Sequence, residues 1–365
     1  QAALYDPSMA KRLVRLVVLV SAVLALVAAA LGCGGSTSDR EAIFVRASLA
    51  SKRFSLENGL HVVLHPDPSF RSVAINVRYE VGSRHDPTAR TGLAHLIEHL
   101  TFRTKPDGTH DVLTMLERAG SSSHNADTTV DATSYYATVP SESLPLALFI
   151  EAARMARPLD GIDDASFMTE RSVVRNERRE RIDDVPYANL GHLAVSVLFE
   201  SSSYGMPTLG LPEDLDRITL ADARRFAARY YRPNNATLVI AGGFDLLRVE
   251  ALVHELFDAI PPAELPNLGV FPEPISRESV RGIMDVGVDA PAVAIAWLVP
   301  PPGRRGWLEM TLLSEWLGGW TKHRLKDAVR RAHSVVLSKD EASVFFFFAE
   351  LAPKLEPRIV VATVD

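Results

Sequence analysis

The spacing of hydrophobic and polar positions changes along the chain, and each spacing predicts a different kind of element. Short apolar or alternating runs bounded by turn residues predict strands, and longer stretches with apolar residues at helical spacing predict helices. The predicted strands are His61–His65, Val73–Val81, Ser123–Thr128, Ala132–Val139 and Ala236–Gly242; the predicted helices are residues 92–100, a short one ending at Gly120, several within Leu144–Tyr230, and Leu246–Ala259. Strands grouped early and helices grouped late indicate an α+β fold with an antiparallel sheet.

A proline-rich segment at 261–275 predicts a linker to a second domain. Beyond it the pattern predicts a strand at Ala292–Val299, helices at Trp307–Leu317 and Arg324–Arg331, and a strand at Val344–Leu351. This order loosely repeats the first domain. We therefore expect two related domains, 53–260 and 276–365, each an antiparallel sheet with helices packed on one side, and the second one incomplete. The aromatic run Phe345–Phe348 indicates either a substrate pocket or, more commonly, a strand buried on both faces.

The amino-terminal segment has the pattern of a secretory signal. Basic residues precede the uncharged apolar run Leu16–Leu31, whose 16 residues fall short of the ~20 that a spanning helix needs. The only cysteine, Cys33, follows in a context that resembles a bacterial lipobox. We expect 1–8 to be an upstream artefact, 9–33 a lipoprotein signal peptide with Cys33 acylated, and 34–52 a tether. The mature protein would then be anchored in the bacterial cell envelope, on the periplasmic face of the outer membrane; a transmembrane anchor is the alternative.

His95, Glu98 and His99 stand in the spacing H-x-x-E-H, the inverted form of a zinc-peptidase motif. On a helix these three side chains share one face, and the apolar residues of the segment gather on the other. Histidines four positions apart can both reach one Zn²⁺, and the carboxylate between them can take a proton from its water. Chance yields this triplet only about 0.02 times in a chain of this kind. The alternative is an ordinary amphipathic helix with a solvated polar face.

A catalytic zinc usually takes three protein ligands, so a third ligand is expected downstream. The segment Asp164–Ile182 predicts a long helix on which Glu170 and Glu177 share one stripe. Either carboxylate could turn toward a metal. An Arg- and Glu-rich helix is also commonly a solvated, salt-bridged surface, and spacing alone does not choose between these interpretations.

The motif and its context resemble the pitrilysin or insulinase family of zinc peptidases, which includes the mitochondrial processing peptidases. In that family a distal glutamate in a Val-Val-x-x-Glu context completes the zinc site. Residues Val173–Glu177 match this context, and Glu177 lies 78 positions after His99. The resemblance therefore implies Glu177 as the third ligand of one Zn²⁺ per chain, and Glu170 as a carboxylate that supports the ligands.

A second part of the resemblance lies between the motif and the long helix. A helix that closes at Gly120 and a strand that carries Asn125 and Ala126 are similar to the family's substrate-binding edge strand. In the family this strand pairs with an extended peptide through main-chain hydrogen bonds, so the resemblance implies that Asn125 and Ala126 bind substrate. An ordinary polar hairpin is the alternative. The neighbouring His124 could line the same cleft.

The resemblance implies a zinc metallopeptidase that hydrolyses peptide bonds in extended or unfolded segments, with Glu98 as general base. The family's second domain often supplies an Arg and a Tyr that hold the substrate carbonyl, and no such pair is assigned in this chain. The alternative is therefore a non-cleaving or partner-dependent subunit of a paired peptidase complex that binds peptides, and its partner would be a related subunit or, in a homodimer, a second copy of the chain. A formal charge of −6 and the absence of a basic stripe argue against a nucleic-acid partner.

Overall fold

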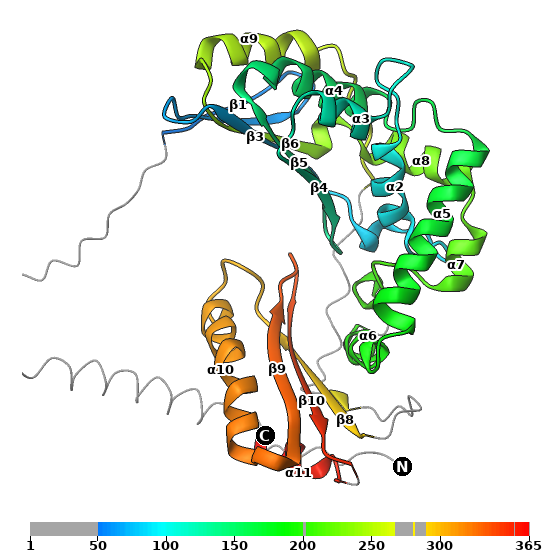
Figure 1. The fold of residues 1–365 in the computed structure, drawn as a ribbon, viewed down its shortest axis with the longest axis vertical. Helices are drawn as coiled ribbons and strands as arrows, with labels where there is room; N and C mark the ends of the chain where they lie inside the picture. The colour runs from blue at the N-terminus through cyan, green and yellow to red at the C-terminus, as the bar shows by residue number, and fades with distance from the viewer. Residues whose placement is uncertain (1–49, 200–201, 267–279, 282–289, 354, 365) are drawn as a thin grey trace, which may run out of the picture.

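A computed structural model of the protein describes residues 50–199, 202–266, 280–281, 290–353 and 355–364. The expected signal peptide, Cys33 and most of the expected tether and linker lie outside these residues. Figure 1 shows two sheets, each with helices beside it, the first sheet curving above the second. In the described part of the chain, no helix is both long enough and apolar enough to cross a membrane.

The first sheet has six strands in the order β1-β2-β6-β3-β5-β4. They are β1 (Lys52–Ser55), β2 (His61–Pro66), β3 (Ser72–Tyr79), β4 (Ser123–Thr128), β5 (Thr133–Pro140) and β6 (Ala236–Gly242). Neighbouring strands are antiparallel except β2 and β6, which run parallel. A parallel pair needs a long crossover, and here the chain between β2 and β6, which includes three other strands and most helices of the domain, provides it. The expected antiparallel sheet is thus correct for four of its five pairings.

Helices cover one face of this sheet. In β3 and β5 alternate residues are buried, among them Val77 and Tyr135, and the residues between them are more exposed. The buried face packs against α4 (Leu144–Ala156), which in turn contacts α9 (Leu246–Phe257). Figure 1 shows both helices on the outer side of the arc, so the more polar face of the sheet points toward the second domain. This one-sided burial is typical of antiparallel sheets.

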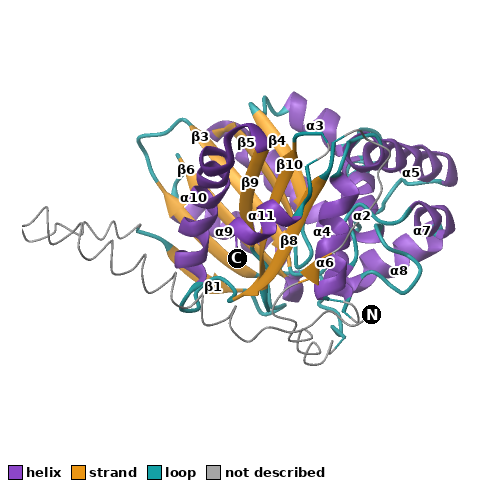
Figure 2. Ribbon diagram, turned by 90° about the horizontal axis from the view of Figure 1, so that it is seen from below, coloured by secondary structure: helices purple, strands orange, loops and turns teal. Residues whose placement is uncertain are grey.

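The remaining helices of the first domain lie toward the β4 side of the sheet, with α3 beside α4 (Figures 1 and 2). They are α2 (Leu93–Phe102), α3 (Val112–Arg118), α5 (Asp164–Arg178), α6 (Ala188–Leu198), α7 (Pro212–Arg217) and α8 (Leu220–Tyr230). Short turns of helix occur at Ser83–His85, Ser141–Ser143, Ser203–Gly205 and Pro233–Asn235. The predicted helix Asp164–Ile182 is α-helical only to Arg178 and continues as a π-helical turn, Arg179–Asp183.

The second sheet is antiparallel, in the order β7-β8-β10-β9. Its elements are β7 (Val280–Arg281), β8 (Ala292–Val299), α10 (Trp307–Leu325), β9 (Val329–Leu337), β10 (Ser343–Leu351) and α11 (Arg358–Val364). The aromatic run lies in β10, between β8 and β9. Phe345 and Phe347 pack with residues of α10 and α11, whereas Phe346 and Phe348 pack with residues of α6. The interpretation as a strand buried on both faces is therefore confirmed.

The expected helix at Arg324–Arg331 is wrong. Helix α10 extends to Leu325, a turn at Lys326–Ala328 follows, and β9 begins at Val329. Lys326 adopts a positive φ of 42°, a conformation that does not continue a helix. Strand β9 lies at the edge of its sheet, where exposed charged residues are typical. These charges hid the alternation that marks a strand.

Helix α6 joins the two domains. It packs on the face of the second sheet opposite α10, and its residues share one hydrophobic cluster with residues of β8 and β10. Next to it, the Tyr187 hydroxyl donates a hydrogen bond of 2.6 Å to the carbonyl of Ala290. The α+β architecture with two sheets agrees with the sequence-based expectation, and the second sheet is covered on one face by a helix of the first domain.

Candidate metal centre

The start of α2 fixes the direction in which the motif residues point. The carboxylate of Asp86 accepts hydrogen bonds from the backbone amides of Gly92 (2.7 Å) and Ala94 (2.8 Å), which the first turn of a helix leaves without partners. Gly92 has a φ of 88°, and a side chain there would meet the backbone of Gly210 at 2.9 Å. The apolar face of α2 is fully buried: Leu93, Leu96, Ile97 and Leu100. The opposite face therefore presents the motif to a cleft.

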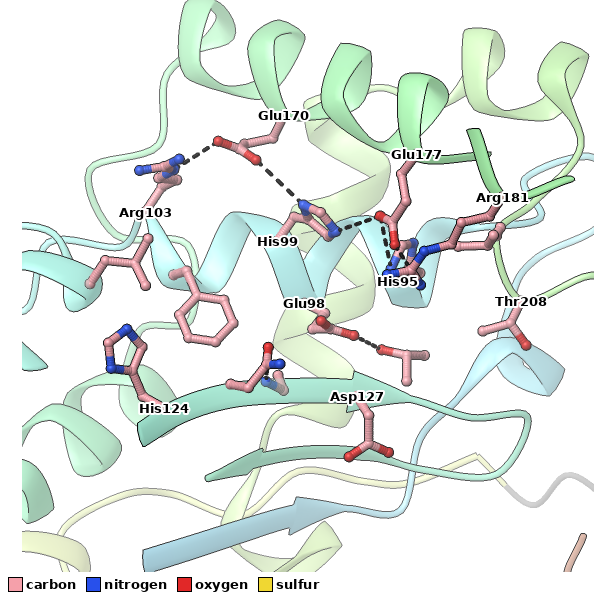
Figure 3. Close-up of a pocket in the computed structure, with 16 residues that line it drawn as sticks. His95, Glu98, His99, Arg103, His124, Asp127, Glu170, Glu177, Arg181 and Thr208 are labelled. Atoms are coloured by element: carbon pink, nitrogen blue, oxygen red, sulfur yellow. Dashed lines mark hydrogen bonds and ion pairs between the residues drawn. The ribbon is translucent and has the colours of Figure 1, made fainter. Parts of the chain in front are cut away.

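His95, His99 and Glu177 converge in this cleft (Figure 3). One carboxylate oxygen, Oε2 of Glu177, lies 3.6 Å from Nε2 of His95 and 3.2 Å from Nε2 of His99. Ligand atoms about 2.0–2.1 Å from a tetrahedral zinc are separated by roughly 3.3 Å. The structure thus brings the carboxylate of α5 to both rings of α2 at separations that fit a shared zinc.

Glu98 belongs to the same cluster. One ligand atom from each of His95, Glu98 and His99 can be chosen so that all lie within 4.8 Å of one another. Oε2 of Glu98 also accepts a hydrogen bond of 2.6 Å from the hydroxyl of Thr128, at the end of β4. Burial raises the pKa of Glu98, and this hydrogen bond acts in the opposite direction. Glu98 thus lies beside the two imidazoles, on the side of β4 and not of α5. A carboxylate in this position can accept a proton from a water at the metal.

Glu170 contacts the other nitrogen of the His99 ring, not the one that faces Glu177. Its Oε2 is 3.6 Å from Nδ1 of His99, and its Oε1 accepts a hydrogen bond of 2.8 Å from Nε of Arg103. A carboxylate facing the second nitrogen of a ligand imidazole fixes the ring's orientation and tautomer. The sequence pattern gave no functional prediction for Arg103 or Thr128. The role of Thr128 in the cleft could have been predicted, because it follows Ala126 by two residues and so lies on the same face of β4.

The two imidazoles have opposite electrostatic environments. Burial lowers the pKa of His95 to about 4, and the positive charge of His99 acts in the same direction. Burial would also lower the pKa of His99, but the facing carboxylates of Glu170 and Glu177 outweigh it and raise this pKa to about 9. The hydrogen bond with His99 keeps the pKa of Glu177 below its usual value. The charges therefore favour a cation at the place where these groups meet.

The chemistry of these donor groups, two imidazoles and one carboxylate, fits zinc. Two imidazole nitrogens and one carboxylate oxygen leave a tetrahedral Zn²⁺ one open position, which is the arrangement of catalytic rather than structural sites. Arg181, on the π-helical turn, pairs with Oε1 of Glu177 at 2.8 Å and leaves Oε2 directed toward the histidines. His95, His99 and Glu177 are the residues that would hold the ion.

The cleft beside these residues has a volume of about 630 Å³. Helix α2, strand β4 and helix α5 contribute its walls, and Thr208 and Leu209 close one side. Strand β4 is an edge strand of the six-stranded sheet, as the resemblance implied. Asn125, Ala126 and His124 all line the cleft, so the expected peptide-binding positions lie beside the candidate metal centre.

Two family models match the chain. "Insulinase (Peptidase family M16)" matches residues 61–204, and "Peptidase M16 inactive domain" matches residues 217–363. The chain has a two-sheet α+β fold, and its H-x-x-E-H helix faces a glutamate. These are the features of the inverted-motif peptidases. The chain belongs to the insulinase family, peptidase family M16.

Similar proteins include two bacterial zinc proteases. The zinc protease PqqE of Helicobacter pylori is 28% identical over 319 residues, which cover 83% of this chain and 70% of that protein. An uncharacterized zinc protease of Mycobacterium tuberculosis is 30% identical over 303 residues, 80% of this chain and 66% of that protein. The chain thus spans about two thirds of the length of these relatives.

Solved structures show the same fold. A protease from Helicobacter pylori superposes with a TM-score of 0.76 at 25% identity, covering 86% of this chain and 78% of that one. A peptidase M16 inactive domain from Pseudomonas fluorescens gives a TM-score of 0.73 at 15% identity, covering 87% and 77%. Pitrilysin gives 0.66 at 19% identity, covering 84% and 34%. The last two are similar in fold alone.

Proposed function

We propose that this protein is a zinc metallopeptidase that cleaves extended or unfolded peptide segments. The observation that carries the proposal is the position of Glu177 Oε2, within 3.6 Å of both motif histidines. Relatives named as zinc proteases support the same activity. We assign His95, His99 and Glu177 as ligands of one Zn²⁺ per chain, Glu170 as the carboxylate that orients His99, and Glu98 as the general base.

The chemistry divides between the metal and the chain. When bound, zinc supplies Lewis-acid chemistry: it makes water acidic enough to attack at neutral pH and polarises the substrate carbonyl. Glu98 accepts the proton of the attacking water and returns it to the leaving amine. Its buried position beside the histidines suits this exchange, because burial raises its pKa toward the working pH.

The edge strand β4 would hold the substrate. The outer edge of β4 lies next to the cleft and carries the backbone groups of Ala126, whose amide donates a hydrogen bond of 2.9 Å to the side chain of Asn125. An extended peptide that pairs there adds one more strand to the sheet, and main-chain pairing places few demands on the peptide's sequence. The cleft combines charged and polar side chains with apolar ones such as Phe102 and Leu113, which is consistent with a peptide substrate.

A partner-dependent peptidase is the second candidate, and one observation favours it. The residues that line the cleft, among those the structure describes, all come from the first domain. The groups that would hold the substrate carbonyl are thus not assigned within the chain, and a related subunit or a second copy could supply them. In this case the lone chain would bind zinc and peptides without cutting them.

The deciding experiment measures cleavage of a mixed peptide library by the purified, zinc-loaded chain. Cleavage by the lone chain at a rate per chain that does not depend on its concentration supports the first candidate and removes the second, whereas a rate per chain that rises with concentration indicates that a second copy is needed. Cleavage only after a related, co-encoded chain is added supports the second. A zinc-loaded chain that cuts nothing in either mixture contradicts both candidates.

We also propose attachment to the bacterial envelope, on the periplasmic face of the outer membrane, through a lipid on Cys33. The sequence pattern of residues 9–33 supports this proposal. Mass spectrometry of the protein expressed with its own amino terminus would show a diacylglycerol adduct on Cys33, and Cys33→Ser would lose it. An unmodified Cys33 in the membrane fraction would contradict the proposal.

A further inference from the structure

Among the residues that the structure describes, the hydroxyl of Thr128 has one close acceptor, the carboxylate of Glu98. It lies 2.6 Å from Glu98 Oε2 and only 3.4 Å from the hydroxyl of Thr133, its register partner on β5. The Thr133 hydroxyl donates its own hydrogen to the carbonyl of Val81 at 2.8 Å. An ionised carboxylate can only accept, so the hydrogen of Thr128 points to Glu98.

The same strand carries the expected peptide-binding positions. Side chains two residues apart in a strand point to the same face, so His124, Ala126 and Thr128 share the face toward α2. All three line the cleft. The edge at which a peptide would pair and the contact with the general base are thus two residues apart on one strand.

We propose that Thr128 is a positioning residue for the general base: its hydroxyl holds Oε2 of Glu98 and leaves Oε1 to face the attacking water. The inference rests on the proposed function and extends it to a residue of the substrate-binding strand. A glutamate side chain has several rotatable bonds, and a charge-assisted hydrogen bond at 2.6 Å restricts the rotation of its carboxylate. A base held in the geometry of proton transfer reacts faster than one that samples other orientations.

The test compares Thr128→Val, Thr128→Ser and Thr133→Val in the zinc-loaded full chain, on a peptide that the wild type cleaves. Valine keeps the shape and removes the hydroxyl, and serine keeps the hydroxyl. Thr133→Val is the matched control, because it removes a buried hydroxyl bond from the neighbouring strand without touching Glu98. The readouts are kcat and KM separately, the zinc content and the melting temperature.

We expect Thr128→Val to lower kcat about 10- to 100-fold, since general-base catalysis as a whole contributes roughly 10²- to 10⁴-fold. KM should change little, because the backbone that would pair with the peptide is unaltered. Thr128→Ser should keep kcat within about threefold of the wild type, and Thr133→Val should lower stability with kcat retained.

Three results would overturn the inference. An unchanged kcat in Thr128→Val shows that the hydroxyl does not position the base. An equal loss in Thr128→Ser shows that the hydroxyl is not the cause, and an equal loss in Thr133→Val shows that the effect is structural. If the wild type with bound zinc cleaves no peptide, the proposed function fails and this inference fails with it; the other three results leave the proposed function standing.

Discussion

Oδ2 of Asp131 accepts a hydrogen bond of 3.0 Å from the backbone amide of Asp340, and this bond joins the two domains. Asp131 lies in the turn between β4 and β5, and Asp340 in the turn between β9 and β10. The other carboxylate oxygen of Asp131 accepts from the Tyr204 hydroxyl at 2.6 Å and pairs with Arg84 at 2.9 Å. Asp131 is 5% exposed, so its charge is compensated inside the protein rather than by water.

We predict that Asp131→Ala lowers the free energy of unfolding by about 3–5 kcal/mol, because it leaves the buried charge of Arg84 without this partner. Urea denaturation measures the change. The matched control is Asp160→Ala, which breaks a pair with Arg157 whose side chains are 40% and 62% exposed. Exposed pairs contribute about 0–1 kcal/mol. Equal losses in the two variants would show that the buried pair of Asp131 with Arg84 contributes no more than an exposed pair.

Glu98→Gln should abolish peptide hydrolysis and leave zinc bound. The amide keeps the size of the carboxylate but cannot accept the proton of the attacking water, so we expect a loss of at least about 10²-fold in kcat. Elemental analysis of the purified variant checks the metal content, and the cleavage assay checks the rate. Activity equal to the wild type would refute Glu98 as the general base.

Glu177→Gln should weaken zinc binding by roughly 10- to 100-fold or more, because it replaces the only charged group proposed as a ligand with a weakly coordinating amide. Competition with a zinc-sensitive dye measures the affinity. His95→Ala should lose zinc as well, since it removes one imidazole. Glu180→Gln, three residues further along and exposed, is the control that should bind zinc as the wild type does. Unchanged affinity in Glu177→Gln would remove Glu177 from the site.

We predict that acid destabilises the folded protein through His85. Its side chain is buried next to Tyr230, and burial together with the charge of Arg84 lowers its pKa to about 4. The folded protein favours the neutral ring, so the free energy of unfolding has its full value above pH 6.5 and falls as the pH is lowered toward 4. The wild type should therefore lose about 3 kcal/mol more than His85→Gln between these two pH values. Parallel pH profiles of the unfolding free energy would contradict the prediction.

The sequence was sufficient for most local structure. The predicted strand Ala236–Gly242 has the bounds of β6, and the predicted strand Ala292–Val299 has those of β8. The apolar spacing of residues 93–100 predicted which face of α2 is buried and which carries His95, Glu98 and His99. The prediction failed at β9, where the charges of an edge strand masked the alternation.

The metal centre shows what spacing along the chain could not decide. Glu170 and Glu177 lie on the same stripe of α5, about 10.5 Å apart along its axis. The sequence pattern treats them alike, and only the resemblance to a family separated them. The packing of α5 against α2 brings Glu177 to the Nε2 atoms of both histidines and Glu170 to Nδ1 of His99.

The sequence by itself determined the elements and their buried faces, because periodicity depends on neighbours within a few residues. The tertiary structure decided the contacts of Thr128 with Glu98, Arg103 with Glu170 and Asp131 with Asp340. Each of these contacts joins two elements, and its geometry depends on how the elements pack. A pattern read along one strand or helix holds no information about the position of the other.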